Sequence, residues 1–137
     1  MASVTYKEGN DLDLDQVIEL YRASTLGERR PMHNRDVMKG MIENADIILT
    51  AWEGSNLVGI SRTLTDFWNV AYLADLAVHL DYQRKGIGKE LIAKTRDALQ
   101  PTCSIMLLSA PKANDYYPKV GFESNPRAWT LGPKTEP

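Results

Sequence analysis

The sequence predicts an α/β (α+β) fold: one domain with a mixed, mostly antiparallel sheet and helices on both of its faces. The chain has 137 residues, of which 43% are hydrophobic and 25% charged, which is typical of one globular domain. Its hydrophobic patterns follow the order strand, two helices, three antiparallel strands, helix, strand, short helix and final strands. This order favours a sheet that is buried under helices on either side.

The first third of the chain is predicted to form a strand and two amphipathic helices. A weak alternation over 3–7 favours a strand. Asp11 or Asp13 can cap a helix, because the apolar residues that follow repeat with helical spacing. These apolar residues are Leu14, Val17, Ile18 and Tyr21. A loop is expected over 25–33, and Asn34 then caps a second helix with one apolar face.

The middle of the chain is predicted to form three strands. The runs 46–53 and 57–64 are rich in β-forming residues, and the Gly-Ser-Asn sequence at 54–56 between them indicates a hairpin. A turn is expected at 66–69. The run 70–80 is nearly all apolar or aromatic, which favours a strand that is covered on both faces.

The last third is predicted to add a helix over 88–99 and a short apolar strand over 104–109. A short helix capped by Asn114 is expected to end at Val120. One or two final strands are expected over 122–131, interrupted at Pro126.

Composition excludes several classes of protein. The lone Cys103 has no intrachain partner and indicates a reducing compartment. The N-terminal segment lacks the basic and apolar regions of a signal peptide, so a cytoplasmic protein without a membrane partner is expected. A net charge of −2 and a pI near 5.7 argue against nucleic-acid binding. We expect one domain over 1–131 with a tail over 132–137, as a monomer or homodimer, and no metal.

The stretch richest in chemical information joins the strand that ends near residue 80 to the helix that begins near 88. Gly86 and Gly88 allow the backbone to turn so that successive amides point outward at a helix N-terminus, which favours a bound pyrophosphate. The residues of this loop are Gln83, Arg84, Lys85, Gly86, Ile87, Gly88 and Lys89. A glycine-rich turn with solvated basic residues would show the same pattern, so context is needed.

Two pieces of sequence supply that context: LADLAVHLDYQRKGIGKELI and, further along, NDYYPKVGF. In these pieces the chain resembles the GCN5-related N-acetyltransferase (GNAT) superfamily, and the resemblance extends from the first strand to about Trp129. It implies a GNAT-like fold and acetyl-CoA as co-substrate. It also implies transfer of the acetyl group, by direct attack, to a primary amine. The short chain favours a small-molecule acceptor of that amine type.

The resemblance also implies roles for individual residues. The backbone that would pair with the pantetheine arm of CoA, as an added strand, is that of Leu76, Ala77 and Val78. Amides over 84–89 would hold the pyrophosphate, and Asn114 would bond to the pantetheine. Tyr117, four residues before Gly121, would be the general acid that protonates the departing thiolate.

The general base is less clear, because the Glu that relatives often carry on the central strand is missing. Tyr72 and Ala74 occupy the plausible sites, and Asp75 is the acid beside them. Some group must take the proton, since freeing an amine of pKa near 10.4 at pH 7 costs about 4 to 5 kcal/mol. The candidate bases are Asp75, Asp66, His79 and Glu28. The residues expected to contact the acceptor are Glu28, Arg29, Arg30, Arg62 and Phe67.

Three other interpretations of this sequence differ in the activity or the fold that they imply. A non-catalytic acyl-CoA-binding regulatory module would explain the missing Glu, although Tyr117 argues against it. A protein or peptide N-acetyltransferase stays open within the same family. A Rossmann domain is disfavoured, because its glycine loop follows the first strand, whereas here the loop lies in mid-chain.

Overall fold

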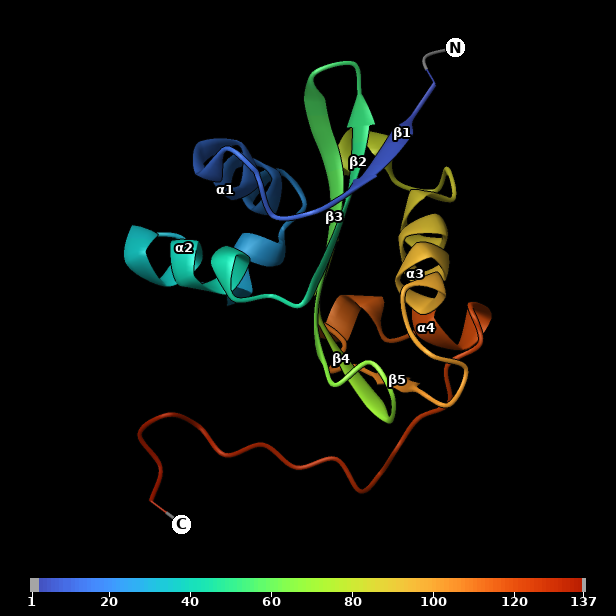
Figure 1. The fold of residues 1–137 in the computed structure, drawn as a ribbon. Coiled ribbons are helices and arrows are strands. Elements are labelled where there is room, and N and C mark those ends of the chain that lie inside the picture. The colour runs from blue at the N-terminus through green and yellow to red at the C-terminus, as the bar shows by residue number, and fades with distance from the viewer. Residues whose placement is uncertain (1–2, 137) are drawn as a thin grey trace. The chain divides into compact units, whose positions relative to one another are not determined.

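The N-terminal unit is built on a mixed sheet (Figure 1). The computed structural model describes residues 3–136 and divides the chain into two units, 1–107 and 108–137. Among the described residues the sheet has five strands in the order β1-β2-β3-β4-β5, with only β4 and β5 parallel. The strands are β1 (Thr5–Glu8), β2 (Ile47–Glu53), β3 (Asn56–Thr65), β4 (Val70–Val78) and β5 (Ser104–Met106). The predicted mixed, mostly antiparallel sheet is confirmed.

Helices cover both faces of this sheet, as the sequence predicts. α1 (Leu14–Ala23) and α2 (Arg35–Glu43) lie on one face, and α3 (Ile87–Asp97) lies on the other (Figure 1). The Asp13 carboxylate accepts from the backbone of residue 15, and the Asn34 amide oxygen accepts from residue 37, so side chains cap the first two helices. No helix within 3–136 has the length and apolar character needed to cross a membrane.

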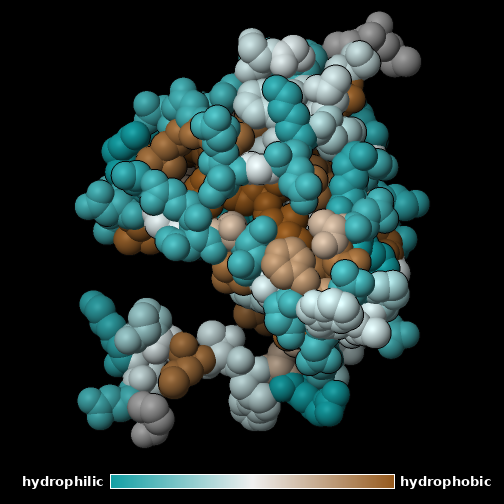
Figure 2. All heavy atoms as spheres, in the orientation of Figure 1, coloured by the Kyte–Doolittle hydropathy of each residue, from teal (hydrophilic) through white to brown (hydrophobic). Residues whose placement is uncertain are grey.

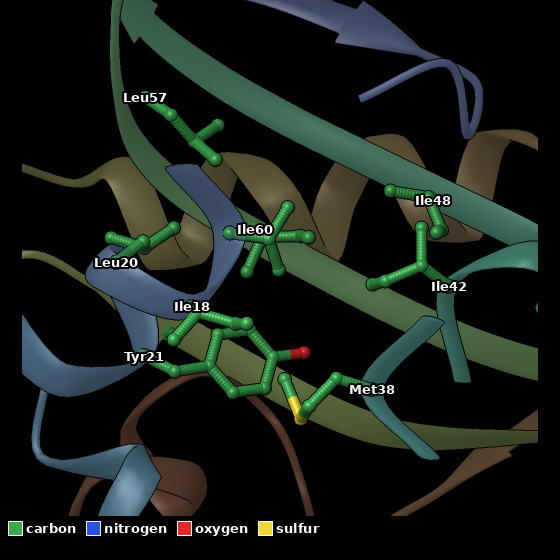
Figure 3. Close-up of a cluster of buried hydrophobic side chains, with 10 residues drawn as sticks. Ile18, Leu20, Tyr21, Met38, Ile42, Ile48, Leu57 and Ile60 are labelled. Carbon is green, nitrogen blue, oxygen red and sulfur yellow. The ribbon is translucent and has the colours of Figure 1, made fainter. Parts of the chain in front are cut away.

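Each face of the sheet has its own hydrophobic cluster. The α1/α2 cluster is drawn in Figure 3, where the Tyr21 ring lies against Met38 from α2. Its labelled members are Ile18, Leu20, Tyr21, Met38, Ile42, Ile48, Leu57 and Ile60. The cluster on the α3 face includes Ile87 and Leu91 of α3 with Ile47, Leu49, Ala51 and Val58 of the sheet. In Figure 2, hydrophilic residues lie over the outer surfaces of the helices and hydrophobic atoms are visible between them.

The C-terminal unit differs most from the sequence-based expectation. The strand expected over 104–109 ends at Met106, and the short helix is α4 (Tyr116–Lys119), preceded by a 3₁₀ turn, η3 (Pro111–Ala113). The strands predicted over 122–131 are wrong, because the structure assigns no strand there. A strand needs a partner for its backbone, and residues 108–136 contain no second strand. Pro126 also lacks an N–H to donate.

Gly59 of β3 allows α3 to approach the sheet closely. A methyl group at Gly59 would lie 3.1 Å from Ile87 Cγ2 and 3.2 Å from both Leu91 Cδ1 and Ala51 Cβ. Gly59→Val should therefore lower the free energy of unfolding by about 1 to 3 kcal/mol through overpacking. Urea unfolding measures this change.

The matched control is Gly40→Ala in α2, where an added methyl group meets nothing within 4 Å. This change should instead stabilise the protein by about 1 kcal/mol, because alanine favours the helix over glycine. A Gly59→Val variant that unfolds at the wild-type urea midpoint would contradict the close approach.

Candidate active site

One edge of β4 is only partly covered by β5. The two strands pair at Val70, Ala71 and Tyr72, whose partners are residues 104–106. Beyond this point, over 73–78, β4 pairs only with β3 among the described strands. The open edge therefore presents peptide groups with which an extended ligand can pair.

Backbone hydrogen bonds show which residues face this open edge. The N–H of His79 donates to a β3 carbonyl at 2.9 Å, and successive residues of a strand direct their peptide groups to opposite sides. The peptide groups of Ala77 therefore face β3, whereas those of Leu76 and Val78 face the open edge. The Gln83 side chain confirms this direction, because its amide donates to the Val78 carbonyl at 3.0 Å.

The loop after β4 ends at the exposed N-terminus of α3. Gly86 is the N-cap residue, with φ +84°, and Arg84 also adopts a left-handed backbone, with φ +64°. The first intrahelical bond runs from Glu90 N to Gly86 O at 3.0 Å, so the amides of residues 87–89 have no acceptor within the helix. Basic side chains beside these amides come from Arg84, Lys85 and Lys89. The helix dipole and these charges together favour an anion such as a pyrophosphate.

A β-bulge interrupts β4 within the open edge. Arg62 of β3 is opposite Asp75 and the next β3 residue is opposite Leu73, so Ala74 has no partner of its own. The Ala74 carbonyl instead accepts from Arg30 Nη2 at 2.8 Å. The bulge thus connects the open edge of β4 with the segment that follows the 3₁₀ helix η1 (Leu26–Arg29).

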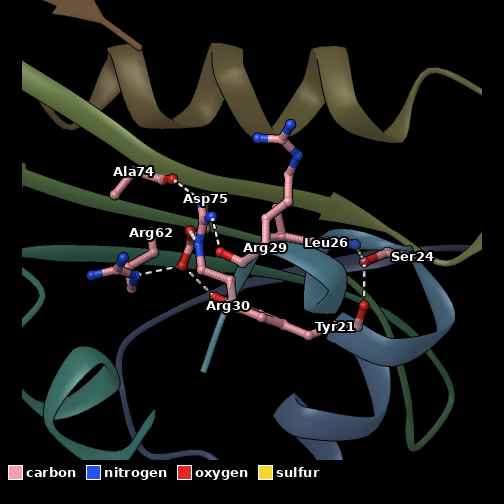
Figure 4. A network of polar contacts seen from close by, with 8 residues as sticks. All are labelled: Tyr21, Ser24, Leu26, Arg29, Arg30, Arg62, Ala74 and Asp75. Atoms are coloured by element: carbon pink, nitrogen blue, oxygen red, sulfur yellow. Dashed lines mark hydrogen bonds and ion pairs between the residues drawn. The ribbon is translucent and has the colours of Figure 1, made fainter. Parts of the chain in front are cut away.

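Asp75 forms the centre of a buried ion cluster (Figure 4). Its Oδ1 accepts from Arg30 Nε, and its Oδ2 accepts from Arg62 Nε and from the Tyr21 hydroxyl, each at 2.6 Å. Burial alone would raise the pKa of Asp75, but the hydrogen bonds and charges around it, chiefly those of Arg62, lower this pKa. Burial and the neighbouring carboxylate raise the pKa of Tyr21. At neutral pH the cluster therefore contains one carboxylate, two guanidinium groups and a neutral phenol.

These surroundings do not favour Asp75 as the general base. Both of its oxygens already accept hydrogen bonds, and its lowered pKa makes it a weaker proton acceptor. Asp66 is similar, because backbone amides of the β3–β4 turn donate to its Oδ1 and lower its pKa. The catalytic role of Asp75 stays a prediction that its geometry does not support.

The other two candidate bases lie in different places. The Nδ1 of His79 accepts from Asp81 N, and His79 is five residues beyond Ala74, or about 16 Å along the strand. Glu28 is exposed on η1, two residues before Arg30, which contacts the bulge. Of these two candidates, only Glu28 is close in sequence to a residue that contacts the bulge.

The predicted acceptor-binding residues are only partly brought together. Arg30 and Arg62 meet at Asp75, and Arg29 contributes its carbonyl to Arg30 Nη1 at 2.9 Å. Phe67 does not join them. It lies in the β3–β4 turn with φ +70°, and its carbonyl accepts from Gln100 near the end of α3.

Asn114 and Tyr117 belong to the C-terminal unit, so their roles stay predictions. Asn114 Oδ1 accepts from Ser109 Oγ at 3.0 Å. The Tyr117 ring packs edge-on against Phe122, with ring centroids 5.5 Å apart. Burial, and to a smaller extent Tyr116, raises the pKa of Tyr117, so its hydroxyl is protonated at neutral pH.

A comparison with known families identifies this arrangement. Residues 18–128 match the model of the acetyltransferase (GNAT) domain. The chain belongs to the GNAT acetyltransferase family. It is 30% identical, over 128 residues, to the uncharacterized N-acetyltransferase ycf52 of Pyropia yezoensis. This match covers 84% of this chain and 71% of that relative. It is 33% identical, over 72 residues, to GCN5-related N-acetyltransferase 2, chloroplastic, of Arabidopsis thaliana, covering 51% of this chain and 28% of that protein.

Solved GNAT structures share this fold. A GNAT-family acetyltransferase of Streptococcus pneumoniae, SP0256, superposes with a TM-score of 0.74 at 22% identity, covering 94% of this chain and 98% of that one. The aminoglycoside N-acetyltransferase AAC(6')-Iy, solved in complex with CoA, gives a TM-score of 0.74 at 17% identity, covering 98% and 97%. The predicted family and acetyltransferase activity of this GNAT chain are confirmed.

The buried ion cluster predicts a large effect of Asp75→Asn on stability. This change leaves two largely buried guanidinium groups without their carboxylate, so we expect a loss of about 3 to 5 kcal/mol at pH 7. Urea unfolding of the variant and the wild type measures it.

Lowering the pH should reduce the difference in stability between the wild type and Asp75→Asn. Because the folded-state pKa of Asp75 is lowered, its stabilising contribution is complete above the unfolded-state pKa of about 3.9 and is lost as pH falls toward the folded value. The gap between wild type and Asp75→Asn should narrow on titration from pH 7 to about pH 3. An equal gap at both pH values would show that the Asp75 charge does not stabilise the fold.

Proposed function

We propose that this GNAT chain transfers an acetyl group from acetyl-CoA to the primary amine of a small molecule by direct attack. One observation carries the proposal. The open edge of β4 leads through residues 79–85 to the free amides of the α3 N-terminus. An extended ligand with an anionic end could pair with the open edge of β4, and the free amides of α3 could bind its anionic end.

The residues of the β4 edge and of the loop fit CoA. Leu76 and Val78 would pair with the pantetheine arm, and the amides of residues 87–89 would bind the pyrophosphate. The position of an added Cβ on Gly86 meets nothing within 4 Å, so the loop is open where the phosphates would lie. CoA is present in the solved structure of one aminoglycoside N-acetyltransferase with this fold, which supports the assignment.

Direct attack fits the distribution of nucleophiles. The single cysteine, Cys103, is 6% exposed and belongs to the hydrophobic cluster on the α3 face. A buried thiol in apolar surroundings is a poor nucleophile. We infer that the acceptor amine attacks the thioester carbonyl itself, that the C–S bond breaks, and that CoA leaves as a thiolate.

Tyr117 would supply the proton that this thiolate accepts. A thiolate of pKa about 8.5 is a tolerable leaving group at neutral pH, so a proton donor assists its departure without being required. The raised pKa of Tyr117 keeps the hydroxyl protonated at neutral pH. The amine proton would pass to Glu28 or to water.

A small-molecule acceptor is supported by the aminoglycoside acetyltransferases among the solved structures of this fold. The cytoplasmic location is likewise a proposal, and the name of one relative places that relative in the chloroplast. Neither the acceptor nor the location in the cell follows from the fold.

Gly88→Val should weaken acetyl-CoA binding while the protein stays folded. A branched side chain in the first turn of α3 blocks close approach of phosphate oxygens to the free amides. We expect a loss of affinity of tenfold or more, about 1.4 kcal/mol, by calorimetry. Gly40→Val in α2 is the control for the helix-propensity cost, and acetyl-CoA affinity unchanged by Gly88→Val would refute the loop assignment.

The function itself is tested by CoA release in the presence of amines, polyamines, amino acids, aminoglycosides and peptides. On the best acceptor, Tyr117→Phe should lower kcat by about 10²-fold while acetyl-CoA affinity stays the same, because only the proton donor is lost. Tyr116→Phe is the control and should have a much smaller effect. If the two variants behave alike, another group or water protonates the thiolate.

A further inference from the structure

The guanidinium group of Arg62 has hydrogen-bond donors that the fold does not use. Its Nε donates to Asp75, whereas Nη1 and Nη2 donate to no partner among the described residues 3–136. Thr63 Oγ1 is the only fully buried side-chain N or O atom without a partner among these residues, so both Arg62 nitrogens retain contact with solvent. Arg62 is nevertheless only 9% exposed as a residue.

Arg30 provides the contrast within the same cluster. Its Nε, Nη1 and Nη2 donate to Asp75, to the Arg29 carbonyl and to the Ala74 carbonyl respectively. Every nitrogen of Arg30 is therefore occupied by the protein. The two arginines thus differ in role, since all three nitrogens of Arg30 donate to the protein, whereas Nη1 and Nη2 of Arg62 do not (Figure 4).

The charge of the cluster also favours an anion. Two guanidinium groups face one carboxylate, and neither arginine has a second acidic partner among the ion pairs of the described residues. The cluster therefore carries an uncompensated positive charge in a largely buried place. Burial opposes the charge on Arg62, but Asp75, with a smaller contribution from Tyr21, outweighs burial and raises the pKa of Arg62. Arg62 is permanently cationic.

The free donors lie beside the place where the reaction would occur. Arg62 is directly opposite Asp75 across the β3–β4 pair, and Asp75 lies between the bulge at Ala74 and the edge residue Leu76. If CoA pairs with Leu76 and Val78, an acceptor that reaches the thioester from the α1/α2 face of the sheet passes Arg62. Arg62 belongs to that face because its Nε and the hydroxyl of Tyr21, which comes from α1, donate to the same oxygen of Asp75.

We propose that Nη1 and Nη2 of Arg62 bind a carboxylate of the acceptor, so that the acceptor is a small amine that carries a carboxylate, such as an amino acid. The proposal rests on the acetyl transfer proposed above. Two parallel N–H donors match the two oxygens of a carboxylate, which gives this pairing both strength and orientation. A polycationic acceptor such as an aminoglycoside would instead meet the positive charge of the cluster and be repelled.

Binding of acetylated products tests the proposal without interference from the pKa of an amine. Calorimetry would compare N-acetylalanine with N-acetylalaninamide, which lacks the carboxylate, on protein saturated with CoA. We expect the acid to bind the wild type about tenfold more tightly or better, and the Arg62→Gln variant to lose this preference. Arg22→Gln removes the same charge from an exposed position of α1 and should keep the preference.

Arg62→Lys is a second variant, which should stay folded because it keeps a cation next to Asp75. It should bind N-acetylalanine more weakly than the wild type, since an ammonium lacks the paired donors. Equal affinity of the acid and the amide for the wild type, or a preference that survives in a folded Arg62→Gln protein, would overturn the carboxylate site.

CoA release separates this proposal from the proposed function. Efficient turnover of amines without a carboxylate, together with equal product affinities, would overturn the carboxylate site and leave acetyl transfer intact. A carboxylate preference in binding, with no CoA release for any amine, would support the site and overturn the proposed function.

Discussion

The ion cluster around the Asp75 carboxylate is the interaction on which the rest of this structure depends. Asp75 is 1% exposed and joins β4 to β3 through Arg62, to α1 through Tyr21 and to the end of η1 through Arg30. A buried pair is not a source of stability by itself, but removing one partner leaves charges that nothing else compensates. Asp75 therefore fixes how three separate segments meet at the middle of β4.

Strand β4 serves two functions because its side chains and its peptide groups point in different directions. The side chains of Asp75 and Ala77 lie on the α1/α2 face, whereas the peptide groups of Leu76 and Val78 lie along the open edge. This edge exists because β5 pairs with only the first part of β4. An acyl donor on the edge and an acceptor on the α1/α2 face would meet near the bulge at Ala74, without competing for the same surface.

Local patterns predicted the order of strands and helices along the chain, because apolar periodicity and capping residues depend on near neighbours in the sequence. The loop at Gly86 was predicted for the same reason, since a turn that requires positive φ is a local demand. The prediction of strands over 122–131 was wrong, because strand formation requires a partner that local sequence does not reveal. The contacts of Asp75 were not predicted for a related reason, because its partners are 13, 45 and 54 residues away along the chain.

The sequence by itself determined the family and the position of the helix N-terminus after the glycine loop, and it predicted that CoA would lie there and beside β4. It also marked Arg30, Arg62 and Asp75 as residues of interest, although with separate roles. Only the tertiary structure decided that these three form one cluster, that both arginines bind Asp75, and that Nη1 and Nη2 of Arg62, unlike those of Arg30, donate to no described residue. The physical reason is that a side chain's charge and hydrogen bonds depend on neighbours in space, whereas periodicity and turns depend on neighbours in sequence.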